Sequence, residues 1–159
     1  MAISTENANL VWQKVGIALD ALGANSFSRA QFAALKAYLS QIKRNKDIQF
    51  LPFTEADCDA AGGTAILSGA GTLHAIFLKK EAEGTDNLFV AYDDATNDTT
   101  DANAILAASL KDSGHEVAVI YPTGLTLATG LLVTQYTSAS GLGKTDGSNG
   151  GNGFAILAA

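Results

Sequence analysis

The stretch GTLHAIFLKK, residues 71–80, decides the fold class of this chain. Successive side chains of a β-strand point to opposite faces of its sheet. Leu73, Ala75 and Phe77 should therefore lie on one face, and Ile76 and Leu78 on the other. Both faces are apolar, so one can pack on an opposing sheet while the second needs a cover. Helices from the N-terminal region or a neighbouring subunit can supply that cover.

Similar segments fill the rest of the chain after this point. Short runs rich in Val, Ile, Leu, Thr and Tyr are separated by Gly, Asn and Asp, as expected for strands joined by turns. They are TAILSG (64–69), NLFVAYDD (87–94), AILAASL (104–110), HEVAVIY (115–121), GLTLAT (124–129), LLVTQYTSA (131–139) and GFAILAA (153–159). AILAASL could instead form a helical turn. The pattern predicts an antiparallel β-sandwich, jelly-roll-like in its arrangement.

The first third of the chain has helical periodicity. In residues 11–22 the apolar stripe consists of Val11, Val15, Ala18 and Leu22, and Gly23 is a stop signal. A second helix is predicted within residues 27–46, ending near Asn45. Its signals are a capping box of Ser28 and Gln31, a hydrophobic staple of Phe27 and Phe32, and an apolar face of Phe32, Leu35, Leu39 and Ile42.

These segments predict an α+β protein in three parts. Residues 1–47 form an N-terminal helical hairpin or arm, and residues 48–63, which contain Pro52 and a Gly pair, form an extended connector. Residues 64–159 form the β-sandwich domain, with a glycine-rich loop at 140–153.

Composition and charge exclude several classes of function. The net charge is −6 and the pI is about 4.7, which argues against a nucleic-acid partner. We expect no membrane partner, because no apolar stretch approaches the ~20 residues of a membrane span, and no signal peptide, because the first residues lack a basic and apolar pattern. Residues 113–159 carry only Glu116, Lys144 and Asp146 as charged side chains. Such a surface is usually buried against another subunit or is made of hydroxyls and amides.

The glycine-rich loop SGLGKTDGSNGGNG, residues 140–153, contains the last three letters of a phosphate-binding P-loop at Gly143, Lys144 and Thr145. The motif also requires a glycine where Ser138 stands, and a helix directly after Thr145. The glycines that follow disfavour a helix by about 1 kcal/mol each. We therefore predict a mobile connector between two strands, and no cofactor.

The acidic loop YDDATNDTTDAN, residues 92–103, offers the metal-ligand candidates Asp93, Asp94, Asp98 and Asp101. Calcium takes six to eight oxygen ligands, so such a cluster could form a site. The loop lacks the glycine and the distal glutamate of an EF-hand, and Asp and Asn favour turns for backbone reasons. A turn without metal is the favoured interpretation.

Catalytic groups form no recognisable motif. Cys58, His74 and His115 are the only cysteine and histidines, and a Cys–His pair is formally possible. His74 alternates with apolar residues, which favours a structural histidine. Lys43, Arg44 and Lys46 complement the negative end of the second helix dipole or contact an acidic partner. We expect no enzymatic activity.

The order of the strand segments resembles that of a known protein family. The order SGAGTLHAIFLKK, NLFVAYDDA, AILAASL, GHEVAVIYPTGLTLATG and LLVTQYTSA, over roughly residues 64–138, resembles a β-sandwich module of small virion proteins of tailed bacteriophages. In that family a Gly-rich segment leads to a strand with Leu-His, and a strand ending in Tyr-Asp follows. A GLT segment then precedes the closing strand. The helices and the glycine-rich loop lie outside the resemblance.

The resemblance implies a structural protein of the virion, folded in the host cytoplasm before assembly. We expect a capsid decoration or cement protein, with a tail, neck or head-fibre component as the alternative. A carbohydrate-binding sandwich using Tyr92, Tyr121 and Tyr136 is a second alternative. The implied partners are other copies, as a homotrimer, and the major capsid protein or another virion protein. Either the helical arm contacts the shell or trimer axis, or the sandwich contacts the shell. The residues expected at the arm's interface are Val11, Val15, Leu22, Phe32, Leu35, Leu39, Lys43 and Arg44.

Overall fold

The computed structural model describes residues 8–42, 48–58, 65–80, 87–96, 103–110, 115–136 and 151–158. Two helices come first in these residues, and strands follow. The elements are α1 (Ala8–Ala21), α2 (Ser26–Ile42), β1 (Ile48–Phe53), the 3-10 helix η1 (Glu55–Cys58), β2 (Leu67–Ser68), β3 (Gly71–Lys80), β4 (Asn87–Tyr92), β5 (Ala104–Leu110), β6 (Glu116–Leu127), β7 (Gly130–Tyr136) and β8 (Gly151–Ala158).

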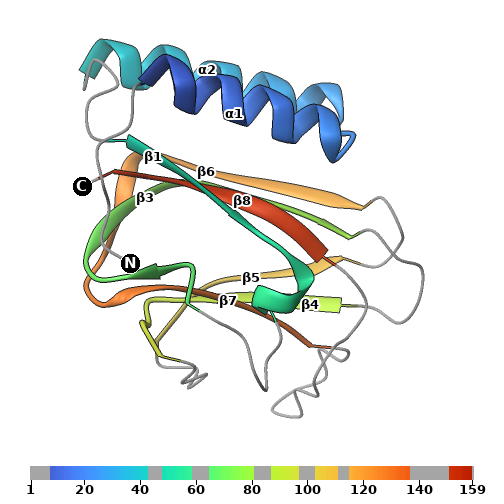
Figure 1. The fold of residues 1–159 in the computed structure, drawn as a ribbon, viewed down its shortest axis with the longest axis vertical. Helices are drawn as coiled ribbons and strands as arrows, with labels where there is room; N and C mark the ends of the chain where they lie inside the picture. Colours follow the sequence, from blue (N-terminus) through green and yellow to red (C-terminus); the bar gives the residue numbers. More distant parts are fainter. Residues whose placement is uncertain are drawn as a thin grey trace.

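The strands form two antiparallel four-stranded sheets. The first has the order β1-β8-β3-β6 and the second has the order β2-β7-β4-β5. The sheets face each other, and α1 and α2 lie together across the outer face of the first sheet (Figure 1). The predicted α+β sandwich is confirmed at this level.

Two apolar cores occupy the spaces between these three layers. The inter-sheet core takes Ile76 and Leu78 from β3, and the helix–sheet core takes Ala75 and Phe77 from the same strand. Phe32 of α2 contacts Phe77 and Phe154 edge-on or tilted, with ring centroids 6.2 and 5.1 Å apart. The cover that the two-sided apolar strand required is therefore supplied by the chain's own helices.

One predicted face in this strand is wrong. Leu73 belongs to the inter-sheet core with Ile76, because the register of β3 shifts between Leu73 and Ala75. An extra residue at a β-bulge moves every later side chain to the opposite face. Gly124 lies in the matching irregular part of β6 with a φ of 85°, and a Cβ there would lie 2.2 Å from Thr72 Cγ2.

Two segments differ from their predicted roles. Residues 48–53 of the expected connector form β1, an edge strand that pairs with β8 along its whole length. The predicted strands 115–121 and 124–129 belong largely to the single strand β6, which continues through Pro122 and Gly124. AILAASL is strand β5 and pairs with β4.

The N-terminal helices are a layer of the fold. Val11, Val15 and Leu19 of α1 and Leu35 and Leu39 of α2 are buried against the first sheet. The predicted apolar stripes are thus the faces that pack on the sheet, and the helices do not project as an arm.

The second helix begins earlier than the predicted capping box. Asn25 is the cap, since its side-chain oxygen accepts a hydrogen bond from the Ser28 amide at 2.8 Å and its carbonyl accepts one from the Arg29 amide at 3.1 Å. Phe27 is 71% exposed while Phe32 is buried. The box of Ser28 and Gln31 and the staple of Phe27 and Phe32 are therefore wrong: Asn25 precedes Ser28 by one helical turn and takes the capping position.

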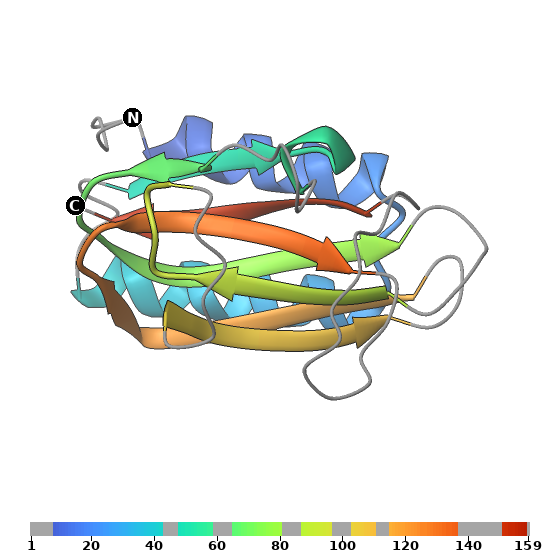
Figure 2. The same cartoon turned by 90° about the horizontal axis from the view of Figure 1, so that it is seen from below.

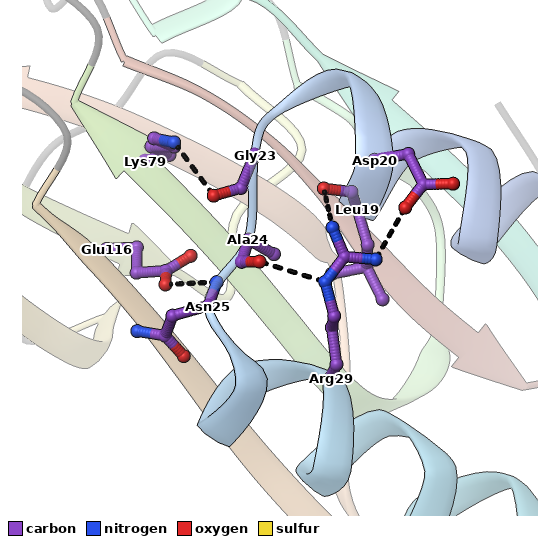
Figure 3. A network of polar contacts seen from close by, with 8 residues as sticks. All are labelled: Leu19, Asp20, Gly23, Ala24, Asn25, Arg29, Lys79 and Glu116. Carbon is purple, nitrogen blue, oxygen red and sulfur yellow. Dashed lines mark hydrogen bonds and ion pairs between the residues drawn. The ribbon is translucent and has the colours of Figure 1, made fainter.

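Two side chains of opposite charge on the first sheet hydrogen-bond to main-chain groups in the turn between the helices (Figure 3). Lys79 and Glu116 are cross-strand neighbours on β3 and β6. The Lys79 ammonium donates to the carbonyls of Leu22 and Gly23, at the negative end of α1. Glu116 Oε1 accepts the Asn25 amide at 2.6 Å, at the positive end of α2. These contacts fix the direction in which α2 runs over β6.

Candidate interaction surface

The described strands place four edges at the borders of the two sheets, and two of these edges are protected. β1 carries the exposed Pro52, which has no amide hydrogen to offer another strand, and β2 is only two residues long. β5 and β6 run along the opposite side of the molecule (Figure 2). β5 has no charged residue and β6 has only Glu116, which accepts the Asn25 amide at the start of α2. In β6 a proline and a register irregularity occur only around residues 121–124, so residues 117–120 carry no charge, proline or bulge that would prevent strand pairing.

The outer edge of β6 presents main-chain groups that no described residue pairs. The Lys80 amide donates to the His115 carbonyl at 2.9 Å. Hydrogen-bonded and non-hydrogen-bonded pairs alternate along an antiparallel ladder. The register then directs the N–H and C=O groups of Glu116, Ala118 and Ile120 away from β3. An added strand could pair with these groups.

A groove lies directly beside this edge. It has a volume of about 310 Å³ and lies between α2 and β6. Its walls are mostly apolar and consist of Gln31, Ala34, Leu35, Tyr38, Ile120 and Pro122. The buried Gln31 Oε1 has no hydrogen-bond partner in the described part of the chain.

Phe27 extends this surface towards the start of α2. Phe27, Gln31, Ala34 and Tyr38 are spaced i, i+4, i+7 and i+11, so they lie along one flank of the helix. Phe27 is the most exposed large hydrophobic side chain in the described residues, at 71%. The β6 edge, the groove and Phe27 together are called the β6 surface below.

The interface residues predicted from the sequence lie elsewhere. Val11, Val15, Phe32, Leu35 and Leu39 are buried in the helix–sheet core, and Leu22 is half-buried. Lys43 and Arg44 lie outside the described residues. Apart from Leu35, which also lines the groove, the predicted apolar set faces the chain's own sheet. The β6 surface was missed because helical spacing identifies an apolar face but does not say what covers it.

Asp93 is a structural residue at the β6–β7 turn. Its carboxylate accepts the amides of Ala128 at 2.8 Å, Thr129 at 2.9 Å and Gly130 at 3.2 Å, and also the Thr129 hydroxyl. Burial alone would raise the pKa of Asp93, but these donors together lower it below its usual value. The carboxylate is therefore engaged within the protein.

Asp94 closes its own loop. Its Oδ1 accepts the Thr96 amide at 2.7 Å and the Thr96 hydroxyl at 2.8 Å, and its Oδ2 accepts Asn103 Nδ2 at 3.1 Å. The bonds from Thr96 lower the pKa of Asp94. Asp98 and Asp101 lie outside the described residues. Among those described, no group of three or more His, Cys, Asp or Glu could hold a metal ion.

The tyrosines expected to stack sugars do not form an exposed platform. Tyr92 and Tyr136 are buried, and their hydroxyl oxygens are 3.0 Å apart in a hydrogen bond. Burial and this bond raise the pKa of Tyr92. Tyr121 packs half-buried on the inter-sheet core, where burial raises its pKa. Sugar stacking on this set would require Tyr92 and Tyr136 to leave their packed positions.

The structure does not bring Cys58 and His74 together. Cys58 is buried in η1, which contacts β1, β7 and β8. His74 is buried at the β3 bulge, where its Nδ1 lies 3.2 Å from the Tyr121 carbonyl of β6. Cys58 therefore lies beside β1, β7 and β8, whereas His74 lies on β3 and faces β6. His115 is exposed at the start of β6. Gly143, Lys144 and Thr145 lie between β7 and β8, outside the described residues.

Searches with protein-family models and against curated proteins and solved structures found no match to this chain. Among the helices described, none has the length and hydropathy needed to cross a bilayer.

Proposed function

We propose that this protein is a non-enzymatic structural protein of a tailed-bacteriophage virion, a capsid decoration or cement protein that stabilises a phage head. The observation that carries the proposal is the charge-poor side formed by β5 and β6, where residues 117–120 of β6 carry neither a charge nor a proline. Proteins that act as monomers usually protect such edges with charges, prolines or very short strands. A protein that works by burying surface in an assembly has no need of that protection.

The topology supports the same class. We propose that the sandwich is a jelly roll, because its strand pairs are nested: β1 pairs with β8, β2 with β7, β3 with β6, and β4 with β5. The chain is thus arranged like one long antiparallel hairpin wrapped into two sheets. Eight-stranded jelly rolls occur in viral capsid domains and also in lectins. The buried positions of Tyr92 and Tyr136 favour the virion role over sugar binding.

The partners in this proposal are other copies of the chain and a shell protein of the particle. Copy-to-copy contacts use the β5–β6 side, where apolar residues are only half-covered. These are Ile105, Leu106, Val117, Val119 and Tyr121. Obligate interfaces are more apolar than ordinary protein surface, which fits this composition.

The test is mass spectrometry and cryo-electron microscopy of virus particles purified from the cells that encode the chain. The proposal expects the chain in every particle at high copy number, with density for two sheets and two helices on the head. Density at the neck or tail would make the protein a component of those parts. Absence of the chain from purified particles would contradict a virion role.

A further inference from the structure

We propose that a second copy of this chain docks on the β6 surface across a two-fold axis. Each copy adds its β6 antiparallel to the other and inserts its Phe27 into the other's groove between α2 and β6. The inference rests on the proposed function, since it identifies the copy-to-copy contact of that assembly. It replaces the three-fold arrangement that the resemblance implies by a two-fold one.

The outward main-chain groups of β6 allow the two copies to pair strand to strand. Glu116, Ala118 and Ile120 direct their N–H and C=O groups away from β3, and no described residue bonds them. A second β6 has the same alternation and can pair with these groups in either antiparallel register that matches their parity. Pairing Ala118 with Ala118 of the second copy places Glu116 opposite Ile120. The two Glu116 side chains are then about 13 Å apart along the strands, so like charges do not meet.

The direction of α2 determines where Phe27 of one copy lies relative to the groove of the other. The helix begins beside Glu116, where the Asn25 amide is held, and its later residues Leu35 and Tyr38 lie beside Ile120 and Pro122. The helix and β6 therefore run the same way. Antiparallel pairing of the strands makes the two α2 helices antiparallel as well, so Phe27 of each copy lies opposite the Tyr38 end of the other's groove.

The shape of the surface fits this arrangement. Phe27 is an exposed apolar side chain that the chain's own fold does not cover, and the groove of about 310 Å³ is an uncovered apolar cleft on the same flank of α2. One copy therefore carries both halves of the contact. A two-fold axis forms each half twice, as an isologous interface requires. This self-complementarity identifies the occupant as a second copy in preference to an unrelated peptide.

Helix spacing is compatible with the paired strands. Strands in a sheet lie about 4.8 Å apart, and packed helices need about 8–10 Å between axes. α2 contacts β6 and, through Phe32, also Phe77 of β3 and Phe154 of β8. The helix therefore extends inward from the β6 edge, and the arrangement requires the two α2 axes to lie farther apart than the paired β6 strands. Ala30 and Ala34 are exposed on the flank that would face the other helix. Their small side chains allow a close approach.

The test is the molar mass of the full chain by sedimentation equilibrium over a wide concentration range. Phe27→Ser is compared with Ile17→Ser, a matched control that is 68% exposed on α1 and outside the β6 surface. A third variant, Ala118→Pro, removes an outward amide without removing a bond to β3. Circular dichroism and thermal melting establish that each variant is folded.

The proposal predicts a dimer that Phe27→Ser and Ala118→Pro weaken by about 30-fold or more, while Ile17→Ser leaves the dissociation constant unchanged. A trimer, or an oligomer that Phe27→Ser weakens no more than Ile17→Ser does, would overturn the two-fold contact. A monomer at every concentration would also overturn it. Particle purification then decides the proposed function separately, because a monomeric chain found on heads would keep the virion role.

Discussion

At the scale of single residues, Gly153 has the least room for a side chain among the glycines compared in the described part of the chain. A Cβ at Gly153 would lie 1.9 Å from the Phe77 carbonyl oxygen and 2.8 Å from Phe53 Cζ. β8 passes between β1 and β3 here, so neither neighbour can retreat without disturbing the first sheet.

Gly153→Ala should therefore lower the free energy of unfolding by about 1–3 kcal/mol. The control is Gly16→Ala at an exposed position of α1, where a Cβ meets nothing within 4 Å. That change should raise stability by about 0.5–1 kcal/mol, because alanine favours the helix. Urea unfolding measures both values. Equal stability of Gly153→Ala and the wild type would refute the close packing.

Asp93 gives the protein a defined response to acid. Its pKa in the folded state is below the unfolded value of about 3.9. The carboxylate therefore stabilises the fold above that pH, and this contribution is lost as the pH falls through the folded pKa.

We expect Asp93→Asn to lower the free energy of unfolding by about 1.5–3 kcal/mol at pH 7, because the Ala128 and Thr129 amides then bond to a poorer acceptor. Its stability should fall less than that of the wild type between pH 5 and pH 2. Asp20→Asn, at an exposed ion pair with Arg29, should change stability by less than about 1 kcal/mol. Melting curves over this pH range check both; parallel curves for Asp93→Asn and the wild type would exclude the assigned role.

At the scale of elements, the start of α2 depends on Asn25. Asn25→Ala should lower the free energy of unfolding by about 1 kcal/mol, because the Ser28 amide loses its acceptor. Gln31→Ala would break a capping box of Ser28 and Gln31, yet here it should cost less than about 0.5 kcal/mol. Chemical denaturation of the two variants distinguishes the caps. A larger loss in Gln31→Ala than in Asn25→Ala would favour the box.

The spacing of apolar residues made most of the strands and both helices predictable from the sequence. Strands show alternation, and helices show a period of about 3.6 residues. β1 was missed because Pro52 suggested a connector, although proline is tolerated on an edge strand. β6 was divided in two because Pro122 and Gly124 are turn residues, yet the strand continues through both, with Gly124 so close to Thr72 and His74 that a Cβ there would collide with them. Leu73 changed face because a bulge in β3 leaves no signal in the periodicity.

The candidate site was much less predictable than the fold. The paucity of charge after Ser113 directed attention to the C-terminal strands, and β6, which forms part of the proposed interface, is one of them. Which edges stay open depends on strand order, and strand order depends on contacts between residues far apart in the sequence. Phe27 looked like part of a helix cap because its neighbours suit one. Its exposure beside the groove, which the sequence does not reveal, is what suggests a contact with a second copy.

At the scale of the whole molecule, the three layers divide the surface into protected and unprotected sides. The helices cover the first sheet, and Pro52 and the short β2 protect one side. On the other side β5 and the part of β6 before Pro122 are open (Figure 2). We propose that copies of the protein assemble through this open side.

Residue-resolved hydrogen exchange of the native chain tests that claim most directly. The amides of Ala118 and Ile120 point away from β3, whereas those of Val117 and Val119 bond to it. The account predicts that Ala118 and Ile120 exchange rapidly in dilute protein and become protected as concentration rises, while Val117 and Val119 are protected throughout. Exchange of Ala118 and Ile120 at one rapid rate up to the highest concentration would contradict assembly through this edge.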